Sequence, residues 1–592
     1  MPALEASACE RINQDARQIL AIAGTPECAV WVGNCDGWQW HTTIRSQDND
    51  RERDNHELGH LTTYCIGSVT KVFVAMGAII LLEQLAEAEG TVYPKLHKLW
   101  RESISAHLDL IVKRQFDRDP ALSDVLCHDG GLVSMNDFIL GPDGKVLISK
   151  AAFLELVQQV TLEIHPSGED STWRYNNGGY ILAGLLIEKY SHQELGLFLK
   201  MNLFDPLGMD LTFVDREAFS SCPAQFKSKA HVVSPSGKPT VVESPDYFPD
   251  TVVFAAMGIY SCTRDLAFFS KTLLAALQPG PDDDSVLTYN RAVQLCSPRV
   301  RFRDDASTSY TYGGCRTKLD SEYLGHHSLN HIVAEACGNM SNYQLSPNSH
   351  GQSVDVLYHG GTVTGYECSL YLLLDDDTFV IALSNATGLV DVSDHISRLI
   401  LQELYLPVGT TSKQKGIGHK LVKFRSKKQQ ANKPESLYKI DIVQMARLGA
   451  EERRRYLERF QMDIDQASHV SQLPIPREGH YIDHRFRQGI FVQHCSIEGL
   501  VAYVKGDFNA SRKFRMAFIS DGVAILAPCL DEDLSVLGVD IFADWESLRL
   551  KICRDYQKQV TGFIRERAQT RVSYTLELET DALSDKTVSF SQ

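Results

Sequence analysis

The longest run of consecutive apolar residues in the chain covers positions 72–82. A helix over this run would be hydrophobic nearly all round, which is typical of a helix buried in a protein core. Ser68 and Lys71 stand at its head, and on a helix they would lie one turn apart on the same face. The run ends at Glu83, so we expect it to be too short to span a bilayer, which takes about 20 apolar residues.

Shorter apolar segments predict strands on both sides of this helix. Residues 29–32 and 38–42 are strand-like and flank a turn rich in Gly, Asn and Asp. Residues 369–374 and 379–383 flank an Asp-rich turn, which is a hairpin signal. We expect both pairs to belong to one mostly antiparallel sheet, and a helix over 392–404 to close the first domain.

The segment between these strands has a helical pattern. Residues 120–225 are predicted to be mainly helical, with turns at 129–131 and 176–179. Residues 270–355 form a long stretch without clear motifs. We expect this stretch to shape the mouth of a cleft.

The C-terminal part changes pattern again. Residues 407–436 are rich in Gly, Thr, Lys and Gln, which predicts a linker. A helix is expected over 437–461, and short strand-like runs recur regularly from Gly479 onward, which predicts a β-rich, barrel-like domain. The predicted organisation is a first domain over 1–406, the linker, and a C-terminal domain over 437–592. The fold class is α/β in the broad sense (α+β).

Composition narrows the functional classes. The chain has 592 residues and a net charge of −16, which disfavours nucleic-acid binding because that needs a basic surface. Its N-terminus lacks a basic region followed by an apolar stretch, so we expect no secretory signal and no membrane partner. The 14 cysteines are scattered without a Cys-x-x-Cys pair, which indicates reduced thiols and a cytoplasmic location.

The spacing of Ser68 and Lys71 suggests nucleophilic chemistry. A serine hydroxyl is a weak nucleophile until a base takes its proton, and a lysine amine in apolar surroundings can act as that base. The spacing Ser-x-x-Lys also occurs at Ser412/Lys415 and Ser436/Lys439, within or next to the polar linker and without an apolar helix behind it. We therefore favour Ser68 and treat the other two as coincidences.

An acyl-transfer site needs further groups to carry protons, hold the substrate and stabilise an oxyanion. Tyr175 and Asn177 stand in a turn just before a predicted helix. His359, Gly360 and Gly361 are predicted to open a strand, where paired glycines would let a substrate approach the backbone. The similar spacing Ser134-Met135-Asn136 is an alternative to the tyrosine turn.

The order Ser-x-x-Lys, Tyr-x-Asn, His-x-Gly resembles the serine β-lactamase/penicillin-binding-protein superfamily. It is closest to the class C-like branch, which includes D-aminopeptidases, D-alanyl carboxypeptidases, esterases and fungal polyketide acyltransferases. Residues 126–132, 204–209 and 257–266 also resemble segments of that family, and the resemblance covers roughly residues 10–405. It implies a β-lactamase/transpeptidase-like fold, with an antiparallel sheet flanked by helices and an all-helical subdomain.

The resemblance also implies roles for single residues. Ser68 would form the acyl-enzyme, Lys71 would be the general base, and Tyr175 would share the proton traffic to the leaving group. Asn177 would hold the acyl or amide oxygen. The oxyanion hole would use the backbone N–H groups of Ser68 and Thr362, the residue after the Gly360-Gly361 pair. His359 stands where many relatives carry Lys, which weakens the case for carboxylate-bearing substrates such as β-lactams or peptidoglycan stems.

These roles predict a serine hydrolase acting on a small-molecule ester, amide or thioester, without a cofactor. An acyltransferase in natural-product biosynthesis that uses the same acyl-enzyme is one alternative, and a non-catalytic scaffold that keeps the fold is another. A His-Glu-x-x-His spacing at 56–60 matches a zinc-protease signature, but its surroundings predict a loop that leads into a strand, and we expect no metal.

Overall fold

The computed structural model describes most of the chain. The residues outside the description are 1–2, 47–55, 91–97, 111–119, 160–172, 279–284, 303–304, 306, 337, 339–342, 348–349, 407–438, 468–475, 484–487, 497–498, 521, 529–547, 556, 558, 568–569 and 578–592. The predicted linker and the serines of the two other Ser-x-x-Lys pairs therefore lie outside the described residues.

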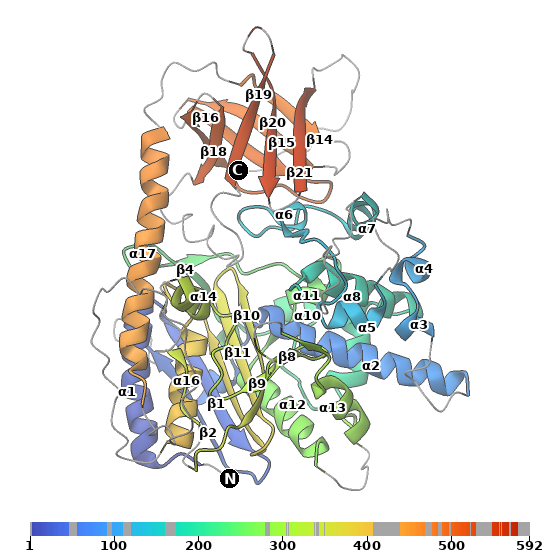
Figure 1. Cartoon of the computed structure of the whole chain (residues 1–592), viewed down its shortest axis with the longest axis vertical. Helices are drawn as coiled ribbons and strands as arrows, with labels where there is room; N and C mark the ends of the chain where they lie inside the picture. Colours follow the sequence, from blue (N-terminus) through green and yellow to red (C-terminus); the bar gives the residue numbers. More distant parts are fainter. Residues whose placement is uncertain are drawn as a thin grey trace, which may run out of the picture.

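The first domain is built on an eight-stranded antiparallel sheet in the order β2-β1-β12-β11-β10-β9-β8-β7 (Figure 1). The N-terminal strand pair lies beside the later hairpin, with Trp31 opposite Ile381, so the predicted shared sheet is confirmed. The strands are β1 (Glu27–Asn34), β2 (Gln39–Arg45), β7 (Val300–Arg301), β8 (Ser309–Tyr310), β9 (Cys315–Lys318), β10 (Asp355–Val363), β11 (Tyr366–Leu373) and β12 (Thr378–Ser384).

Helices cover both faces of this sheet (Figure 1). The helices α1 (Ala6–Ala23) and α16 (Val392–Tyr405) pack together on one side, and α12 (Thr263–Ala276) packs against β1 and β12. The predicted closing helix over 392–404 is thus confirmed as α16. Every residue of α16 from Val392 to Gln402 is buried, because the helix packs on β11 and β12 on one side and against α1 and α17 on others.

The apolar run forms the central helix of the helical subdomain. The single-turn 3-10 helix η3 (Gly67–Val69) leads directly into α2 (Thr70–Ala88), which packs against α8 (Asn177–Ser191) and α11 (Phe254–Met257). By length and hydropathy, the helix Gly67–Ala88 is long and apolar enough to cross a membrane, so the prediction that this apolar segment is too short to span a bilayer was wrong. In its most apolar stretch of 18 residues, 83% is buried inside the protein, as expected of a core helix.

Three local predictions were wrong in detail. Residues 300–318 supply the edge strands β7, β8 and β9, although the sequence predicted only a cleft-shaping stretch there. His359 lies in the middle of β10, four residues after its start, and does not open the strand. His56–Leu61 forms the 3-10 helix η2 before the short strand β3 (Tyr64–Cys65), instead of a loop.

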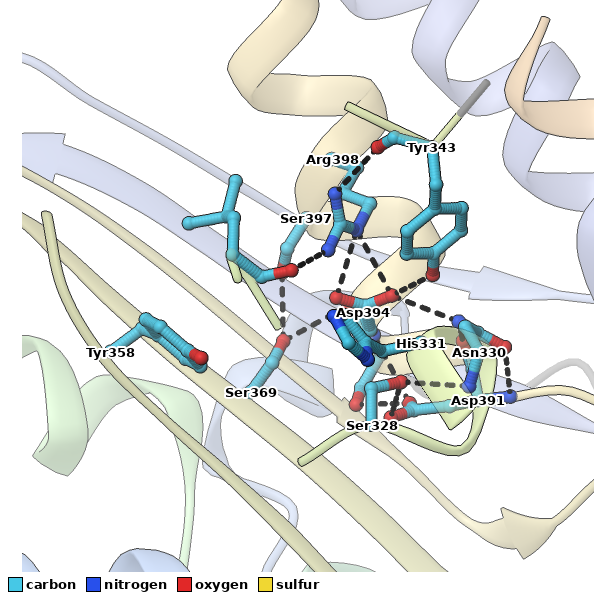
Figure 2. A network of polar contacts seen from close by, with 12 residues as sticks. Ser328, Asn330, His331, Tyr343, Tyr358, Ser369, Asp391, Asp394, Ser397 and Arg398 are labelled. Carbon is cyan, nitrogen blue, oxygen red and sulfur yellow. Dashed lines mark hydrogen bonds and ion pairs between the residues drawn. The ribbon is translucent and has the colours of Figure 1, made fainter. Parts of the chain in front are cut away.

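A buried polar network attaches the segment after β9 to α16 (Figure 2). The Arg398 guanidinium donates to both carboxylate oxygens of Asp394, at 3.1 Å each, and to the backbone carbonyl of Tyr343 at 3.0 Å. Asn330, from α14 (Leu329–Ala336), donates to Asp394 at 2.9 Å. The network ties Asn330 and Tyr343 to α16 through paired and hydrogen-bonded charges, which is the form in which buried charges are tolerated.

The C-terminal strands form a closed barrel in the order β14 to β21, which confirms the predicted barrel-like domain (Figure 1). The predicted helix 437–461 is observed as α17 (Ile442–Ala467), which packs along α1, α14 and α16 and also touches β17. The barrel strands are β14 (Gly479–Asp483), β15 (Gln488–Cys495), β16 (Gly499–Lys505), β17 (Phe514–Ser520), β18 (Val523–Pro528), β19 (Arg549–Arg554), β20 (Val560–Arg567) and β21 (Thr570–Glu577).

Candidate active site

Ser68 and Lys71 lie where η3 passes into α2. The Nζ of Lys71 is 3.0 Å from the Oγ of Ser68. Lys71 is fully buried, whereas Ser68 is partly accessible between the buried residues Gly67 and Val69. The serine hydroxyl can therefore meet a ligand on one side while the amine contacts it from inside the protein.

The surroundings of Lys71 favour an uncharged amine. Its Nζ also donates to Asn177 Oδ1 at 2.8 Å and to the backbone carbonyl of Ala256 at 2.9 Å. Burial lowers the pKa of Lys71 well below that of an ordinary lysine. A neutral amine has two N–H bonds and one lone pair, so these two acceptors use both N–H bonds. The lone pair is then left for the hydroxyl proton of Ser68.

Asn176 caps α8 and thereby places its two neighbours at the site. Its side chain accepts from the backbone N–H of Gly179 at 3.3 Å, and it donates to the carbonyls of Leu132 and Val133 at 2.7 and 2.9 Å. Asn177, on one side of the cap, reaches Lys71. The ring of Tyr175, on the other side, has its centroid 4.9 Å from the Nζ of Lys71. The structure therefore brings together Ser68, Lys71, Tyr175 and Asn177.

Asn136, from the alternative Ser134-Met135-Asn136 spacing, also lies at the site, but it contacts Asn177 and not Lys71. The Nδ2 of Asn177 donates to the Oδ1 of Asn136 at 3.2 Å. Asn177 contacts Lys71 directly, and Asn136 contacts Asn177. The two asparagines are thus successive members of one hydrogen-bonded chain.

The glycine pair of β10 lies against the loop that carries Ser68. A Cβ added to Gly361 would lie 2.1 Å from the carbonyl oxygen of Ile66 and 3.0 Å from the backbone nitrogen of Ser68. A Cβ added to Gly67 would lie 3.0 Å from the nitrogen of Thr362. Only glycine permits this approach, which brings the N–H groups of Ser68 and Thr362 to one location. Two such donors are what an oxyanion hole requires.

His359 is turned into the protein and is 2% exposed. Its Nδ1 lies 2.6 Å from the carbonyl oxygen of Gly360, and its Nε2 lies 3.1 Å from the hydroxyl of Tyr310. Burial, together with the nearby Lys71, lowers the pKa of His359 to about 3. The position that holds Lys in many relatives therefore carries a neutral ring whose two nitrogens both have partners inside the protein.

A profile described as Beta-lactamase matches residues 12–404, about two thirds of the sequence and nearly the whole first domain. The chain belongs to the beta-lactamase family. It thus has the fold of beta-lactamase-family serine hydrolases, as its sequence motifs indicated.

Individual relatives of this beta-lactamase-family protein are distant. An unguisins hydrolase of Aspergillus campestris is 25% identical over 159 residues, which are 26% of this chain and 28% of that protein. Similar solved structures include an octameric penicillin-binding protein homologue of Pyrococcus abyssi, with 14% identity, coverage of 96% and 98%, and a TM-score of 0.49. A D-stereospecific amidohydrolase of a Streptomyces species has 17% identity, coverage of 66% and 98%, and a TM-score of 0.45. A beta-lactamase/D-alanine carboxypeptidase of Pseudomonas syringae has 14% identity, coverage of 67% and 99%, and a TM-score of 0.46.

The sequence motifs of this beta-lactamase-family protein did not predict Tyr310 at the site. Tyr310 lies on the two-residue strand β8, in the stretch without clear motifs. His128, which the sequence marked only as part of the segment 126–132, has its Nε2 atom 3.2 Å from the hydroxyl oxygen of Tyr310. The signal that could have marked Tyr310 is the short alternation of β8 and β9, which is too brief to distinguish from a loop.

His60, the second histidine of the His-Glu-x-x-His spacing, packs against aromatic side chains of β1 and β2 and not against the residues around Ser68. The centroid of the His60 ring lies 4.8 Å from that of His41 and 5.8 Å from that of Trp31. Within the described part of the chain, no group of three or more His, Cys, Asp or Glu side chains is arranged to hold a metal ion. The side chain of His56 is outside that part.

Proposed function

We propose that the protein is a serine hydrolase that forms an acyl-enzyme on Ser68 from an ester or amide. The observation that carries this proposal is the contact between the fully buried amine of Lys71 and the Oγ of Ser68, with both N–H bonds of that amine directed to other acceptors. A lysine held neutral beside a serine is an internal base for that serine.

In the proposed reaction, the proton of the Ser68 hydroxyl moves to Lys71 as Oγ bonds to the substrate carbonyl carbon. The carbonyl oxygen becomes an oxyanion that accepts from the N–H groups of Ser68 and Thr362. The bond to the leaving group then breaks, and the proton held by Lys71 goes to that group, with Tyr175 beside Lys71 as the second proton carrier. Water attacks the ester on Ser68, releases the acid and restores the free enzyme.

The neutral ring of His359 supports a substrate without a carboxylate at that end of the site. A carboxylate would meet no cation there, because the pKa of His359 is lowered to about 3. The name of the Aspergillus relative, an unguisins hydrolase, supports hydrolysis over the acyltransferase alternative, although the match covers only 28% of that protein.

A fluorophosphonate probe tests the proposal. It should attach covalently to the wild type, and mass spectrometry of the digested protein should place the adduct on Ser68. Ser68→Ala should abolish the adduct. Ser134→Ala is the matched control, since Ser134 is an exposed serine two residues before Asn136, and it should label like the wild type. An adduct that persists in Ser68→Ala would overturn the nucleophile assignment.

Product analysis separates hydrolysis from acyl transfer. With a chromogenic ester, the proposed hydrolase should release the free acid at a rate that added alcohol or amine leaves unchanged. An acyl product that forms on the added acceptor at the expense of the acid would favour the acyltransferase. A folded wild type that neither takes the probe nor cleaves esters or amides would favour the non-catalytic scaffold.

A further inference from the structure

The connection between β16 and β17 at residues 506–512 lies against a hairpin of the helical subdomain at residues 139–149, and Gln488 of β15 also donates to the carbonyl of Phe138 at 3.5 Å. The backbone N–H groups of Phe508 and Asn509 donate to the carbonyl of Leu147 at 2.9 and 3.1 Å. Figure 1 shows α6 (Asn136–Ile139), which leads into this hairpin, directly beside the barrel.

Side chains strengthen this contact in both directions. Asp507 accepts from the backbone N–H of Ser149 at 3.0 Å and from its hydroxyl at 2.6 Å. Asp143, which is buried, accepts from the backbone N–H of Arg512 at 2.6 Å. Gly506 lies so close that an added Cβ would be 2.2 Å from the carbonyl oxygen of Leu147. The loop therefore touches the hairpin with backbone and side chains together.

The hairpin is also fixed on its other side. It is closed by a bridge between Leu140 and Val146, and the N–H of Leu147 donates to the carbonyl of Ile139 at 2.8 Å. At its tip, the carbonyl of Gly144 accepts from the hydroxyl of Tyr247 at 2.6 Å. The hairpin is thus held by the barrel loop on one side and by Tyr247 of the first domain on the other, so a displacement of the barrel loop can reach the residues next to the hairpin.

The residue that begins α6 is Asn136, and it belongs to the hydrogen-bonded chain at the site. Asn136 Oδ1 accepts from Asn177 Nδ2 at 3.2 Å, and Asn177 Oδ1 accepts from Lys71 Nζ at 2.8 Å. An amide has its donor and its acceptor on opposite sides. Holding Nδ2 of Asn177 on Asn136 therefore directs its Oδ1 to Lys71.

We infer that Asn136 is a positioning residue for the Asn177–Lys71 pair, and that the barrel loop 506–512 holds Asn136 in place through the hairpin. This gives the C-terminal domain a role in the active site without a direct contact to Ser68. The inference rests on the proposed function, because the property that it explains is the orientation of the base.

The experiment uses two glycines of the full-length barrel. Gly506→Ala places a methyl group against Leu147 and should push the loop off the hairpin, whereas Gly522→Ala adds the same group where nothing lies within 4 Å. Gly506→Ala should lower the rate of fluorophosphonate labelling by about tenfold or more, since small misplacements of catalytic groups are costly. Gly522→Ala should label like the wild type.

Asn136→Ala should lower the rate by a similar factor. It should also move the midpoint of the pH–rate profile to lower pH. If Asn177 turns away, the charged form of Lys71 loses more hydrogen-bond stabilisation than the neutral form, and the pKa of Lys71 falls. The double variant Gly506→Ala/Asn136→Ala should be no slower than Asn136→Ala, since both changes act on one path. Asp507→Ala, which removes both bonds to Ser149, gives a milder variant should Gly506→Ala not fold.

Two results would overturn the inference while leaving the proposed function intact. The first is a folded Gly506→Ala or Asp507→Ala protein that labels on Ser68 at the wild-type rate. The second is a double variant whose losses multiply, which would mean independent effects. Failure of the proposed function has a different signature, which is no labelling of the wild type or labelling that survives Ser68→Ala.

Discussion

The hydroxyl of Tyr310 and the Nε2 of His359 lie 3.1 Å apart, and their surroundings fix which one donates. A carbonyl can only accept, so the Nδ1 of His359, at 2.6 Å from the oxygen of Gly360, carries the single proton of the neutral ring. Tyr310 must therefore donate to Nε2. On its other side it accepts from His128, whose Nδ1 already accepts from the backbone N–H of Asn176 at 3.1 Å.

This series of hydrogen bonds links the cap of α8 to β10. Tyr310→Phe should therefore change the hydrogen bonding of His359 and leave the residue itself in place. The Nε2 atom would lose its donor and the tautomer would no longer be fixed. We expect labelling of Ser68 to slow about tenfold, by displacement of the adjacent Gly360-Gly361 backbone. Nitrogen-15 NMR of the histidine rings should show His359 shift from the pure Nδ1–H form towards a mixture.

The matched control is Tyr358→Phe, which removes another buried hydroxyl from the neighbouring residue. Tyr358 donates to the carbonyl of Tyr323 at 2.6 Å and so points away from the site. Tyr358→Phe should lower the free energy of unfolding about as much as Tyr310→Phe does, but it should leave the labelling rate and the His359 tautomer unchanged. Equal effects of the two variants on labelling would show that Tyr310 acts only through the stability of the fold.

The base assignment predicts both the size and the pH dependence of a Lys71 variant. Lys71→Met keeps an unbranched buried side chain and removes the amine, so we expect labelling to fall by about 10³-fold or more. In the wild type, the labelling rate should rise with pH through a midpoint well below that of an ordinary lysine, because burial lowers the pKa of Lys71 and only the neutral amine can accept the proton. The rate should show no separate step from His359 between pH 5 and 8, since its pKa is lowered to about 3.

The pH–rate profile of labelling, with circular dichroism as a check on folding, measures these effects. Folded Lys71→Met that labels at the wild-type rate would exclude Lys71 as the base. A wild-type midpoint near that of exposed lysine would show that the amine is protonated at neutral pH.

The parts of the site that lie on long, regular elements could be predicted from the sequence. Ser68 and Lys71 stand at the head of an apolar helix, and Tyr175 and Asn177 flank its neighbour's cap, so the local pattern made them candidates and the family resemblance gave them roles. Tyr310 could not be found in this way, because its strand has two residues and its partners are 49 and 182 positions away. The barrel was predictable from its evenly spaced strands, but its docking on the hairpin before α7 (Lys150–Gln159) was not, because it combines backbone bonds with contacts such as Asp507 to Ser149 between residues far apart in the sequence.

The buried pair between Arg398 and Asp394 makes a strong stability prediction (Figure 2). The two side chains are 1% and 2% exposed. Arg398→Met would leave the carboxylate of Asp394 without its cation, and we expect a loss of about 3–5 kcal/mol in the free energy of unfolding. Urea denaturation measures it. Arg455→Met, which removes an exposed partner of Glu452, is the control and should cost under about 1 kcal/mol. A loss for Arg398→Met as small as the control's would show that the network does not hold this part of the fold.

The buried histidines predict a loss of stability in mild acid. Burial lowers the pKa of His395 to about 4, with Asp394 opposing the shift and Arg398 adding to it, whereas an unfolded histidine titrates near 6.5. Because the folded pKa is lowered, the stabilisation is complete above pH 6.5 and is lost as the pH falls towards 4. Between pH 7.5 and 5, His395 alone should cost about 2 kcal/mol.

His395→Leu isolates this contribution, since neither ring nitrogen of His395 has a hydrogen-bond partner among the described residues. Measured by urea denaturation, the stability of the variant relative to the wild type should rise by about 2 kcal/mol between pH 7.5 and 5. His494→Leu, at an exposed position of the barrel, should show no such rise. The other titrating groups cancel in these differences, so a His395→Leu curve parallel to the wild type would mean that His395 is not held neutral by the fold.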